Sequence, residues 1–472
     1  TLADAIHSAN DDISVGGCTA GSGADVIILT GDVDLTSALP DVDNGSVITL
    51  RGNGFRVRRL STASAFRVFY VPVNGDLTID NTIVAGGAAD SAPGILSRGA
   101  RAITNSTITQ NVTSGIFGGG IYSDGTLTLD HSTVSDNSAV FGGGLSNFGE
   151  ATISYSRFDG NYASSRGGAI HHDGTLMLLH SALTNNLVQG DGGAPGHSAG
   201  GGLFAYFGST TLLNTTISGN TIIDGNGGGV MAYYGSVTLE NTTIADNSAP
   251  SGSAIFEYYS YPTLINAVVD GSCSGTIING GNNIGCGFGG PTGLDGTLAD
   301  NGGPTPTHAL LDGSPAIDHA GPCNHPDQRG FGRSGDCDSG AYEYEGVRPA
   351  IGGTAGGLDT FRAKCANRAT AQQVTVDLGG ATSWDCESAG LAADLGDVLE
   401  QSIIGRASSD GDPIGGSVTG MRLSSVLCTN VTTDQQVAIV PAGLAVDWDC
   451  STAGLTHLEG DRIRMSARGD SD

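Results

Sequence analysis

A glycine-rich marker recurs between residues 117 and 255, and it restricts the possible folds more than any other feature of the chain. The apolar residue that closes each marker falls at positions 121, 145, 170, 203, 230 and 255, so the steps are 24, 25, 33, 27 and 25 residues. An asparagine keeps the same period, at Asn111, Asn137, Asn161, Asn186, Asn220 and Asn247. Two different markers with one period of about 25 residues indicate a repeat protein.

The runs between the markers have the pattern of β-strands. Thr126–Leu129 and Ser236–Leu239 alternate hydroxyl and apolar residues, which is the period of a strand with one buried face. A repeat of about 25 residues with two or three strands and Gly or Asn corners predicts an all-β fold, a right-handed parallel β-helix over residues 24–293. Its coils would lie about 4.8 Å apart. We expect the six asparagines to stack between coils as a structural ladder.

Two short motifs within the repeats are Gly167-Gly-Ala-Ile170 and Phe158-Asp-Gly-Asn161. They resemble the repeats of the chlamydial polymorphic outer-membrane proteins and related bacterial adhesins, over residues 90–270. The resemblance implies a β-helix and a surface location rather than an activity.

The start of the chain predicts a cap. Apolar residues at positions 2, 5, 6 and 9 share one helical face, and a short amphipathic helix within residues 1–23 would cover the open first coil. Thr1–Ile6 resembles the CSLREA-type start of secreted bacterial β-helix proteins, with Ala-Asp in place of the usual Arg-Glu. That motif begins with a cysteine, which the resemblance implies as the partner of Cys18.

Residues 294–345 contain Asp300–Thr305, His308–Asp318 and Asp338–Glu343. These segments closely resemble the choice-of-anchor Q region, which lies at the C-terminal end of bacterial surface β-helices. The resemblance implies that residues 294–345 form the final coils of the solenoid and a cap. It also implies that a variable attachment module follows.

The remainder of the chain is duplicated. A segment with Cys365-Ala-Asn and Trp384-Asp-Cys386 recurs 63 or 64 residues later as Cys428-Thr-Asn and Trp448-Asp-Cys450. Residues 346–410 and 411–472 are therefore interpreted as two tandem β-sandwich-like domains. We expect a disulfide in each, because a domain of this size has a small core.

Eight of the nine cysteines are close in sequence to a partner, which predicts disulfides and an oxidising compartment. The pairs are Cys273–Cys286, Cys323–Cys337, Cys365–Cys386 and Cys428–Cys450. Cys18 is left to bridge to another chain, to stay free, or to pair with a residue before Thr1. Zinc is a poor alternative because the chain has no Cys-x-x-Cys. We therefore expect a secreted protein, extracellular or at the cell surface.

Charge and hydropathy exclude two classes of partner. Lys and Arg number 20 against 48 Asp and Glu, a net charge of −28, so the chain lacks the basic face of a nucleic-acid binder. It also lacks an apolar run long enough to span a membrane. We expect no nucleic-acid partner, no membrane span, no cofactor and no metal.

An enzyme is the serious rival, because parallel β-helices often host polysaccharide lyases and glycosidases. A pectin-type hydrolase needs clustered carboxylates, and its Asp-Asp, Gly-His-Gly and Arg-Ile-Lys motifs have only misplaced counterparts here. A lyase needs a basic residue, and Arg157 and Arg166 are the only ones besides histidines in residues 110–270. His171-His172-Asp173 could bind a metal or act as a base, but a polar corner is the favoured interpretation. We predict no catalytic residues.

Aromatic residues recur after the glycine marker in the last three coils and form the candidate binding face. Its residues are Tyr206, Tyr233, Tyr234, Phe256, Tyr258 and Tyr259, with His197 on a loop inserted in the 33-residue step. Such a face could stack on carbohydrate or contact a protein. The alternative is a set of side-chain stacks covered by the loop or the tail.

These observations favour a non-catalytic extracellular structural protein, a subunit of a surface fibre, sheath or matrix that self-associates through β-helix ends and tail domains. The alternative is a surface adhesin that binds glycan or protein, among other cell-surface components, through the aromatic face. A polysaccharide lyase or glycoside hydrolase is the least favoured interpretation.

Overall fold

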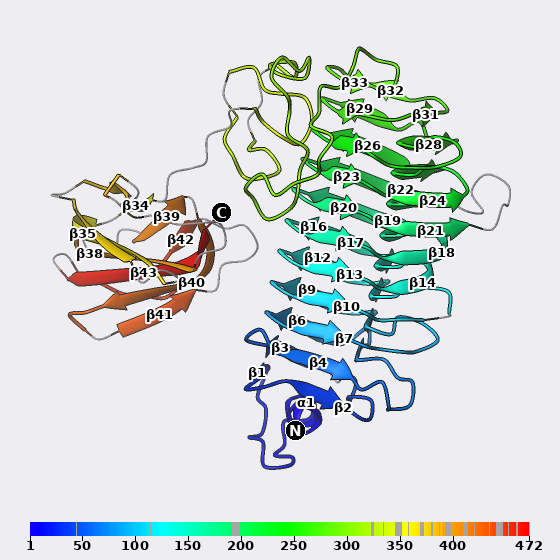
Figure 1. Cartoon of the computed structure of the whole chain (residues 1–472). Coiled ribbons are helices and arrows are strands. Elements are labelled where there is room, and N and C mark those ends of the chain that lie inside the picture. Colours follow the sequence, from blue (N-terminus) through cyan, green and yellow to red (C-terminus); the bar gives the residue numbers. More distant parts are fainter. Residues whose placement is uncertain are drawn as a thin grey trace. The chain divides into compact units, whose positions relative to one another are not determined.

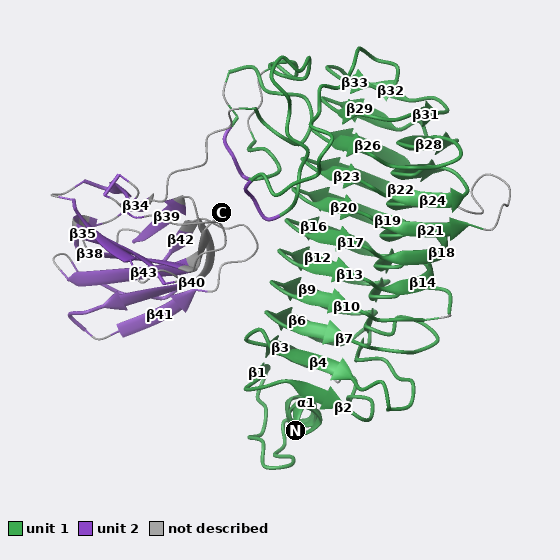
Figure 2. Cartoon of the chain, in the orientation of Figure 1, with its two compact units in different colours: residues 1–301, 305–329, 333–346 green, residues 302–304, 330–332, 347–472 purple. Residues whose placement is uncertain are grey.

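The computed structural model describes residues 1–472 except 44, 114, 191–198, 322–324, 334, 345–351, 357, 369–371, 379–380, 387, 390, 392–397, 409–413, 420, 434, 440–446, 452, 459–460 and 472. The chain forms two compact units (Figure 2). The first comprises residues 1–301, 305–329 and 333–346, and the second comprises residues 302–304, 330–332 and 347–472.

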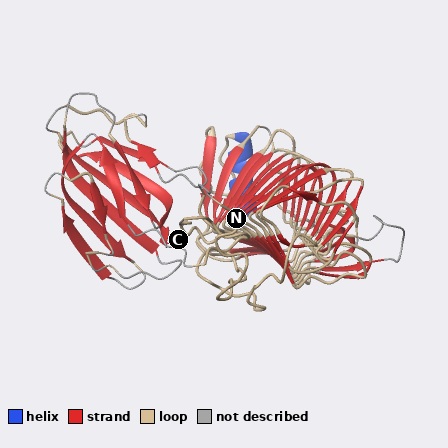
Figure 3. Cartoon of the chain, turned by 90° about the horizontal axis from the view of Figure 1, so that it is seen from above, coloured by secondary structure: helices blue, strands red, loops and turns tan. Residues whose placement is uncertain are grey.

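The first unit is a parallel β-helix whose successive coils pair in register along three sheets (Figures 1 and 3). The eleven-stranded sheet consists of β2 (Val33–Leu35), β4 (Arg56–Arg59), β7 (Ile83–Ala85), β10 (Thr107–Thr109), β13 (Thr133–Ser135), β17 (Arg157–Asp159), β20 (Ala182–Thr184), β23 (Thr216–Ser218), β27 (Thr243–Ala245), β30 (Val268–Val269) and β33 (Ile284–Gly285). A four-stranded side sheet consists of β14 (Ser138–Phe141), β18 (Tyr162–Arg166), β21 (Leu187–Gly190) and β24 (Thr221–Asp224).

The eighteen-stranded sheet contains two rows of strands, separated in most coils by a bend. The first row consists of β5 (Phe69–Val71), β8 (Ile95–Ser97), β11 (Ile121–Ser123), β15 (Leu145–Asn147), β25 (Val230–Tyr233), β28 (Ile255–Tyr258) and β31 (Cys273–Ser274). The second row consists of β1 (Ala24–Ile28), β3 (Val47–Arg51), β6 (Asp76–Asp80), β9 (Ala100–Thr104), β12 (Thr126–Asp130), β16 (Glu150–Ser154), β26 (Ser236–Glu240), β29 (Thr263–Ile265) and β32 (Ile278–Asn279). The long strands β19 (Ile170–Leu179) and β22 (Leu203–Leu213) belong to both rows. The parallel β-helix expected from the repeat is confirmed.

The glycine marker has a steric cause. Its first glycine has positive φ, as at Gly142 with φ 63°. A Cβ on the next residue, Gly143, would lie 2.4 Å from the carbonyl oxygen of Tyr162 and 2.6 Å from that of Gly168. The apolar residue that follows the marker is fully buried in each coil, so the marker turns the chain and then starts an interior row.

The repeated asparagines form a continuous ladder inside the β-helix. Each Nδ2 from Asn111 to Asn220 donates to the Oδ1 of the asparagine one coil further on, at 2.8–3.1 Å. Each also donates to a backbone carbonyl, for example Asn161 to Val134 at 2.8 Å. The six side chains are 0–9% exposed. Amides that both donate and accept can therefore satisfy one another along the axis in a place that water does not reach.

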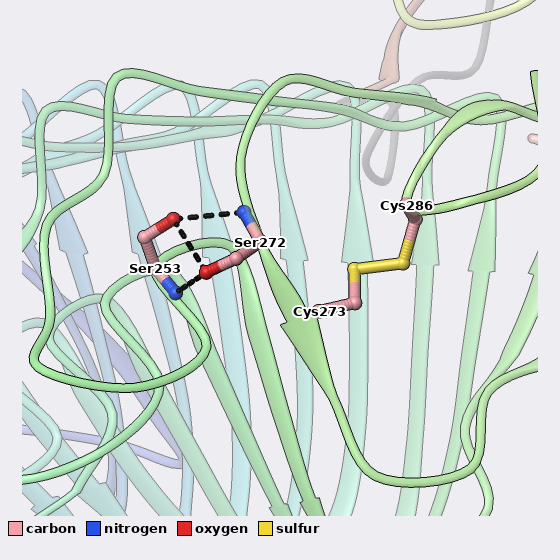
Figure 4. Close-up of a disulfide and its surroundings, with 4 residues drawn as sticks. All are labelled: Ser253, Ser272, Cys273 and Cys286. Carbon is pink, nitrogen blue, oxygen red and sulfur yellow. Dashed lines mark hydrogen bonds between the residues drawn. A yellow bond between two sulfur atoms is a disulfide. The ribbon is translucent and has the colours of Figure 1, made fainter.

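The N-terminal end of the coils is capped, and the C-terminal coils are cross-linked. Helix α1 (Leu2–Asp11) starts at a capping box between Thr1 and Asp4, and its apolar face is buried in the β-helix core. At the other end, the Cys273–Cys286 disulfide ties β31 to the turn after β33 (Figure 4). Ser253 and Ser272 bridge the preceding coil, with backbone N to Oγ distances of 2.9 Å in both directions.

Residues 294–344 differ from the expected terminal coils. Its described residues within the first unit add no parallel strand and instead pack along the outer face of the eleven-stranded sheet. His308 Nε2 lies 2.8 Å from Ser218 Oγ, and the backbone N of Ala341 donates to Thr243 Oγ1 at 3.0 Å. The segment is rich in turns and lacks the 25-residue period, so it cannot continue the coil.

A buried charge cluster holds this folded-back segment together. Arg329 contacts Asp327 at 2.6 Å, and Arg333 contacts Glu343 at 3.2 Å, with all four side chains at most 4% exposed. Burial raises the pKa of Asp338 to about 6, although it accepts backbone hydrogen bonds from Asp318 and Tyr344. The charged residues of the folded-back segment thus pair with one another where this segment packs against the β-helix.

The second unit is a β-sandwich built by both sequence copies together. The four-stranded sheet has the order β37 (Ser383–Asp385), β34 (Gly352–Gly356), β39 (Gly415–Thr419) and β42 (Asp447–Asp449). The six-stranded sheet has the order β36 (Gln372–Asp377), β35 (Leu358–Asn367), β38 (Val398–Ala407), β43 (Arg462–Ser471), β40 (Met421–Asn430) and β41 (Gln435–Ile439). The repeat is present, but the copies are not separate domains.

Pairing across the copies is symmetric. Thr354 pairs with Ser417 in the first sheet and Ser402 with Ser466 in the second, and each pair joins equivalent positions of the two copies. One core is buried between the sheets, with the disulfides Cys365–Cys386 and Cys428–Cys450 inside it. The predicted partner of Cys337, Cys323, lies outside the described residues, and Cys18 is free.

Candidate functional site

Two rows of aromatic rings lie side by side on the outer face of three consecutive coils. The inner row, Tyr206, Tyr233 and Tyr258, comes from β22, β25 and β28, and its rings stack at centroid distances of 5.2 and 5.0 Å. The outer row, Phe207, Tyr234 and Tyr259, consists of the next residue in each coil and stacks at 5.5 and 5.3 Å. Parallel in-register strands place each ring one coil above the last. These six residues are called the double row.

The two rows support each other edge to face. Within each coil the inner and outer rings meet at 4.4–4.8 Å with interplanar angles of 73–79°. Such T-shaped contacts place the positive edge of one ring against the negative face of another. The outer rings remain 45%, 46% and 59% exposed, while the inner rings are half-buried. The arrangement presents a rigid apolar surface to solvent.

The double row continues into a longer aromatic stripe. His171 stacks between Phe141 and Phe204, at 5.4 and 5.3 Å, and Phe204 stacks on Tyr206 at 5.7 Å. Arg166 lies over the Phe141 and Phe204 rings, 5.1 and 5.3 Å from their centroids. The stripe therefore extends over several coils and has a cation at its middle.

The pKa values of ionisable side chains in the stripe are shifted in the direction that favours their neutral forms. Burial, together with the charge of Arg166, lowers the pKa of His171 to about 3. Desolvation raises the pKa values of Tyr233 and Tyr234. At neutral pH His171, Tyr233 and Tyr234 are thus uncharged.

His172 has a structural role. Its Nδ1 lies 3.2 Å from Asn147 Nδ2, which must donate, so its Nε2 carries the proton and donates to the carbonyl of Ser209 at 3.3 Å. Burial lowers its pKa to about 4. The side chain is 0% exposed and points into the β-helix, so it reaches neither substrate nor solvent. Within the described residues, no three His, Cys, Asp or Glu side chains could hold a metal ion.

A second ring stack lies at another corner of the β-helix. His131, Tyr155 and His180 stack at 4.7 Å each, and all three have positive φ. His180 is buried under the folded-back segment, where its Nδ1 lies 2.9 Å from the carbonyl of Asp327, and burial lowers its pKa to about 4. This stack is therefore a contact within the unit.

The structure brings most of the candidate binding residues together. Tyr206, Tyr233, Tyr234, Tyr258 and Tyr259 belong to the double row, and Phe256 packs beside it. His197 lies outside the described residues.

Sequence reasoning did not connect Phe117, Phe141 and Phe148 to this face. Phe117 and Phe141 precede a glycine marker and bridge adjacent coils, so the marker itself contained the signal. Phe148 lies at a bend and contacts the Phe117 ring at 4.9 Å.

Comparisons with known proteins bear on the fold. No protein-family model and no curated protein matches the chain. Among solved structures it is similar to pectate lyase Pel9A, with 16% identity, a TM-score of 0.42, and coverage of 68% of this chain and 87% of that one. It is also similar to the Dettilon tailspike protein, with 11% identity, a TM-score of 0.24, and coverage of 95% and 86%. A third match is the enzymatically active domain of tailspike protein 4 of bacteriophage CBA120, with 10% identity, a TM-score of 0.26, and coverage of 95% and 62%.

These matches overturn two predictions. The chain was predicted to be a non-catalytic fibre subunit and not an enzyme, whereas the solved chains that match it are a lyase and two phage tailspikes, one of them an enzymatically active domain. Self-association through β-helix ends has no support in the structure either. No described helix is long and apolar enough to cross a membrane. At 10–16% identity, the similarity to the solved structures concerns the β-helix fold alone.

Proposed function

We propose that the protein binds an extended, neutral polysaccharide along the double row. The observation that carries this proposal is the alignment of six rings in two parallel files, with the outer file Phe207, Tyr234 and Tyr259 about half exposed. Tyr261, 54% exposed, follows in the same coil as Tyr259. A contiguous aromatic surface of this kind on a folded chain marks a binding site.

The spacing favours a chain ligand that lies along the β-helix axis. Rings recur every 5.0–5.5 Å, once per coil. Rings that stack on one another along the axis turn their edges to solvent. A pyranose with equatorial hydroxyls has an apolar C–H face that can pack against such an edge, and an extended β-1,4-linked chain advances by a similar distance with each sugar. Successive sugars would therefore meet successive rings. Because the rings already hold one another in place, binding would cost little side-chain entropy.

Charge favours a neutral ligand over a polyanion. The chain carries a net charge of −28, and Arg166 is the cation that the structure places over the stripe. Its guanidinium is already stacked on Phe141, Phe204 and Tyr206. Repulsion would thus oppose a uronic-acid polymer in the absence of a bridging cation.

The proposal includes an oxidising, extracellular location. The three disulfides among the described residues support it, because disulfides persist in oxidising compartments.

Isothermal titration with cellohexaose and chitohexaose tests the proposal. We expect binding to the native protein and a loss of roughly 5–10-fold for each of Tyr234→Ala and Tyr259→Ala, since one aromatic contact contributes about 1 kcal/mol. Ile223→Ala is the matched control, because Ile223 is 53% exposed but lies in the side sheet. No binding of either oligosaccharide, or unchanged binding by both tyrosine variants, would refute the proposal.

The same protein samples can be used to test whether the bound polysaccharide is also cleaved. Each oligosaccharide and polygalacturonate, with and without calcium, would be incubated with the protein and analysed for shorter or unsaturated products. Products that form with the native protein and decrease in Tyr234→Ala would make the double row a substrate subsite. Preferred binding of polygalacturonate in calcium would contradict the neutral-ligand assignment.

A further inference from the structure

One arginine lies in the interior of the β-helix. Arg101 in β9 pairs in register with Leu77 in β6 and Leu127 in β12, both of which point into the core and are at most 1% exposed. Arg101 itself is 3% exposed. It therefore occupies a leucine position of an inward-facing row, with its guanidinium surrounded by the coil.

The hydrogen bonds of this guanidinium are incomplete. Its Nη2 donates to Ser123 Oγ at 3.3 Å, while Nε and Nη1 are buried without a partner. Within the described part of the chain, nothing accepts the proton of the Ser123 hydroxyl. The Nε and Nη1 groups of Arg101 and the hydroxyl of Ser123 are thus three neighbouring buried donors without a described acceptor.

The adjacent carboxylate pairs with another arginine and acts on Arg101 only from a distance. Asp124 follows Ser123, but its Oδ2 lies 3.6 Å from Nε of Arg98, a surface side chain that is 53% exposed. Beyond Ser123 the interior row continues with Asn147 and then His172, and both turn donors toward backbone carbonyls. No described carboxylate contacts the Arg101 guanidinium.

A buried charge that no counter-charge contacts is strongly disfavoured. Transfer of an ion from water to a protein interior costs several kcal/mol even after relaxation, and unpaired donors add to that cost. Burial lowers the pKa of Arg101 to about 9, so the guanidinium still carries its proton at neutral pH. A mobile anion would compensate the charge and accept all three sets of donors at once.

We propose that Arg101 and Ser123 form an internal binding site for a small monovalent anion of the chloride or bromide class. The closed surroundings select against larger anions, because Ser97 and Ser123 are 0% exposed and the aliphatic residues Leu77, Ile103 and Leu127 are at most 1% exposed. The ion enters during folding or by transient opening of the coil. Its effect is to stabilise the N-terminal half of the β-helix.

Thermal unfolding in two salts tests the site. Protein refolded and dialysed into sodium bromide is compared with protein in sodium gluconate at equal ionic strength, because gluconate is too large for the site. We expect a saturable rise of Tm with bromide that reaches roughly 3 °C at a hundredfold excess over Kd. Crystals grown in bromide should show an anomalous peak within hydrogen-bond distance of the Arg101 guanidinium.

Two variants separate this site from general salt effects. Arg101→Leu restores the leucine of the neighbouring coils, so it should fold, lose the bromide dependence and unfold in gluconate no earlier than the native protein. Arg98→Gln, which alters a surface arginine of the preceding strand connection, should keep the dependence. An identical Tm of the native protein in both salts would overturn the proposal and leave Asp124 as the counter-charge. Retained dependence in Arg101→Leu would overturn it as well.

Discussion

Removal of one amide from the middle of the asparagine ladder should destabilise the β-helix severely. Asn161 is 0% exposed, donates to Val134 O and Asn186 Oδ1, and accepts from both the backbone N and the Nδ2 of Asn137. In Asn161→Ala the backbone N of Asn137 and the carbonyl of Val134 lose these side-chain partners. Each buried unsatisfied group costs about 1–3 kcal/mol, so we expect a loss of about 4 kcal/mol in the free energy of unfolding.

Asn161→Asp separates donor loss from acceptor loss. The carboxylate would keep the acceptor for Asn137 but would face the oxygens of Val134 and Asn186, which now lie 2.8 and 2.9 Å from Nδ2. We expect a loss at pH 7 at least as large as that of the alanine variant. Part of it should return as the pH falls, because a protonated carboxyl can donate once.

The measurement is urea unfolding followed by far-UV circular dichroism. Trp384 and Trp448, the two tryptophans of the chain, lie in the second unit, so tryptophan fluorescence monitors that unit separately. Asn226→Ala is the matched control, since the Asn226 side chain is only half-buried and makes no hydrogen bond within the described structure. A loss below about 1 kcal/mol for Asn161→Ala, or one equal to that of the control, would refute the ladder as a source of stability.

Two further predictions follow from burial and from close packing. The three buried histidines of the β-helix (171, 172 and 180) stay neutral in the folded state, so stability is full above pH 6.5 and is lost as the pH falls through 6.5 toward 4, by at most about 4 kcal/mol per pH unit. The pKa of Asp338 is raised to about 6, so protonation of this group at lower pH partly offsets the loss of stability. Urea unfolding at pH 7, 6 and 5 would measure the net loss. A stability that does not change with pH would contradict the burial of the histidines. Gly143→Ala should lower stability by about 2–4 kcal/mol, because its Cβ would lie 2.4 Å from a backbone oxygen of the next coil. Gly296→Ala, where nothing lies within 4 Å, should be nearly neutral in the same assay.

The β-helix can be predicted from the sequence because each coil repeats the same steric requirements. Three features recur at one period: a glycine at the corner, a glycine that a carbonyl of the next coil approaches, and a buried amide. Their spacing therefore predicts the fold. The rings of the double row follow the same markers, which is why residues such as Tyr233 and Tyr258 could be named in advance.

Other features depend on contacts between distant segments. The folded-back segment has no period, and His308 and Ser218 are brought together only by the tertiary fold. The duplication in the tail is plain in the sequence, but strand pairing between copies is not, because a strand has the same alternation whichever copy it joins. Arg101 likewise looks like a surface strand residue until its register with Leu77 and Leu127 is known.

The shared sheets of the second unit determine when it can form. β43, the last described strand, lies between β38 of the first copy and β40 of the second, so the six-stranded sheet has no centre until that strand arrives. Synthesis from the N-terminus would leave the edges of β34 and β38 open while the second copy is still being made. The unit resembles a dimer whose two halves belong to one chain. Because the halves are covalently linked, they pair at the high effective concentration that the connection sets. A chain that stops before β43 would expose two sheet edges to other molecules instead of to its own duplicate.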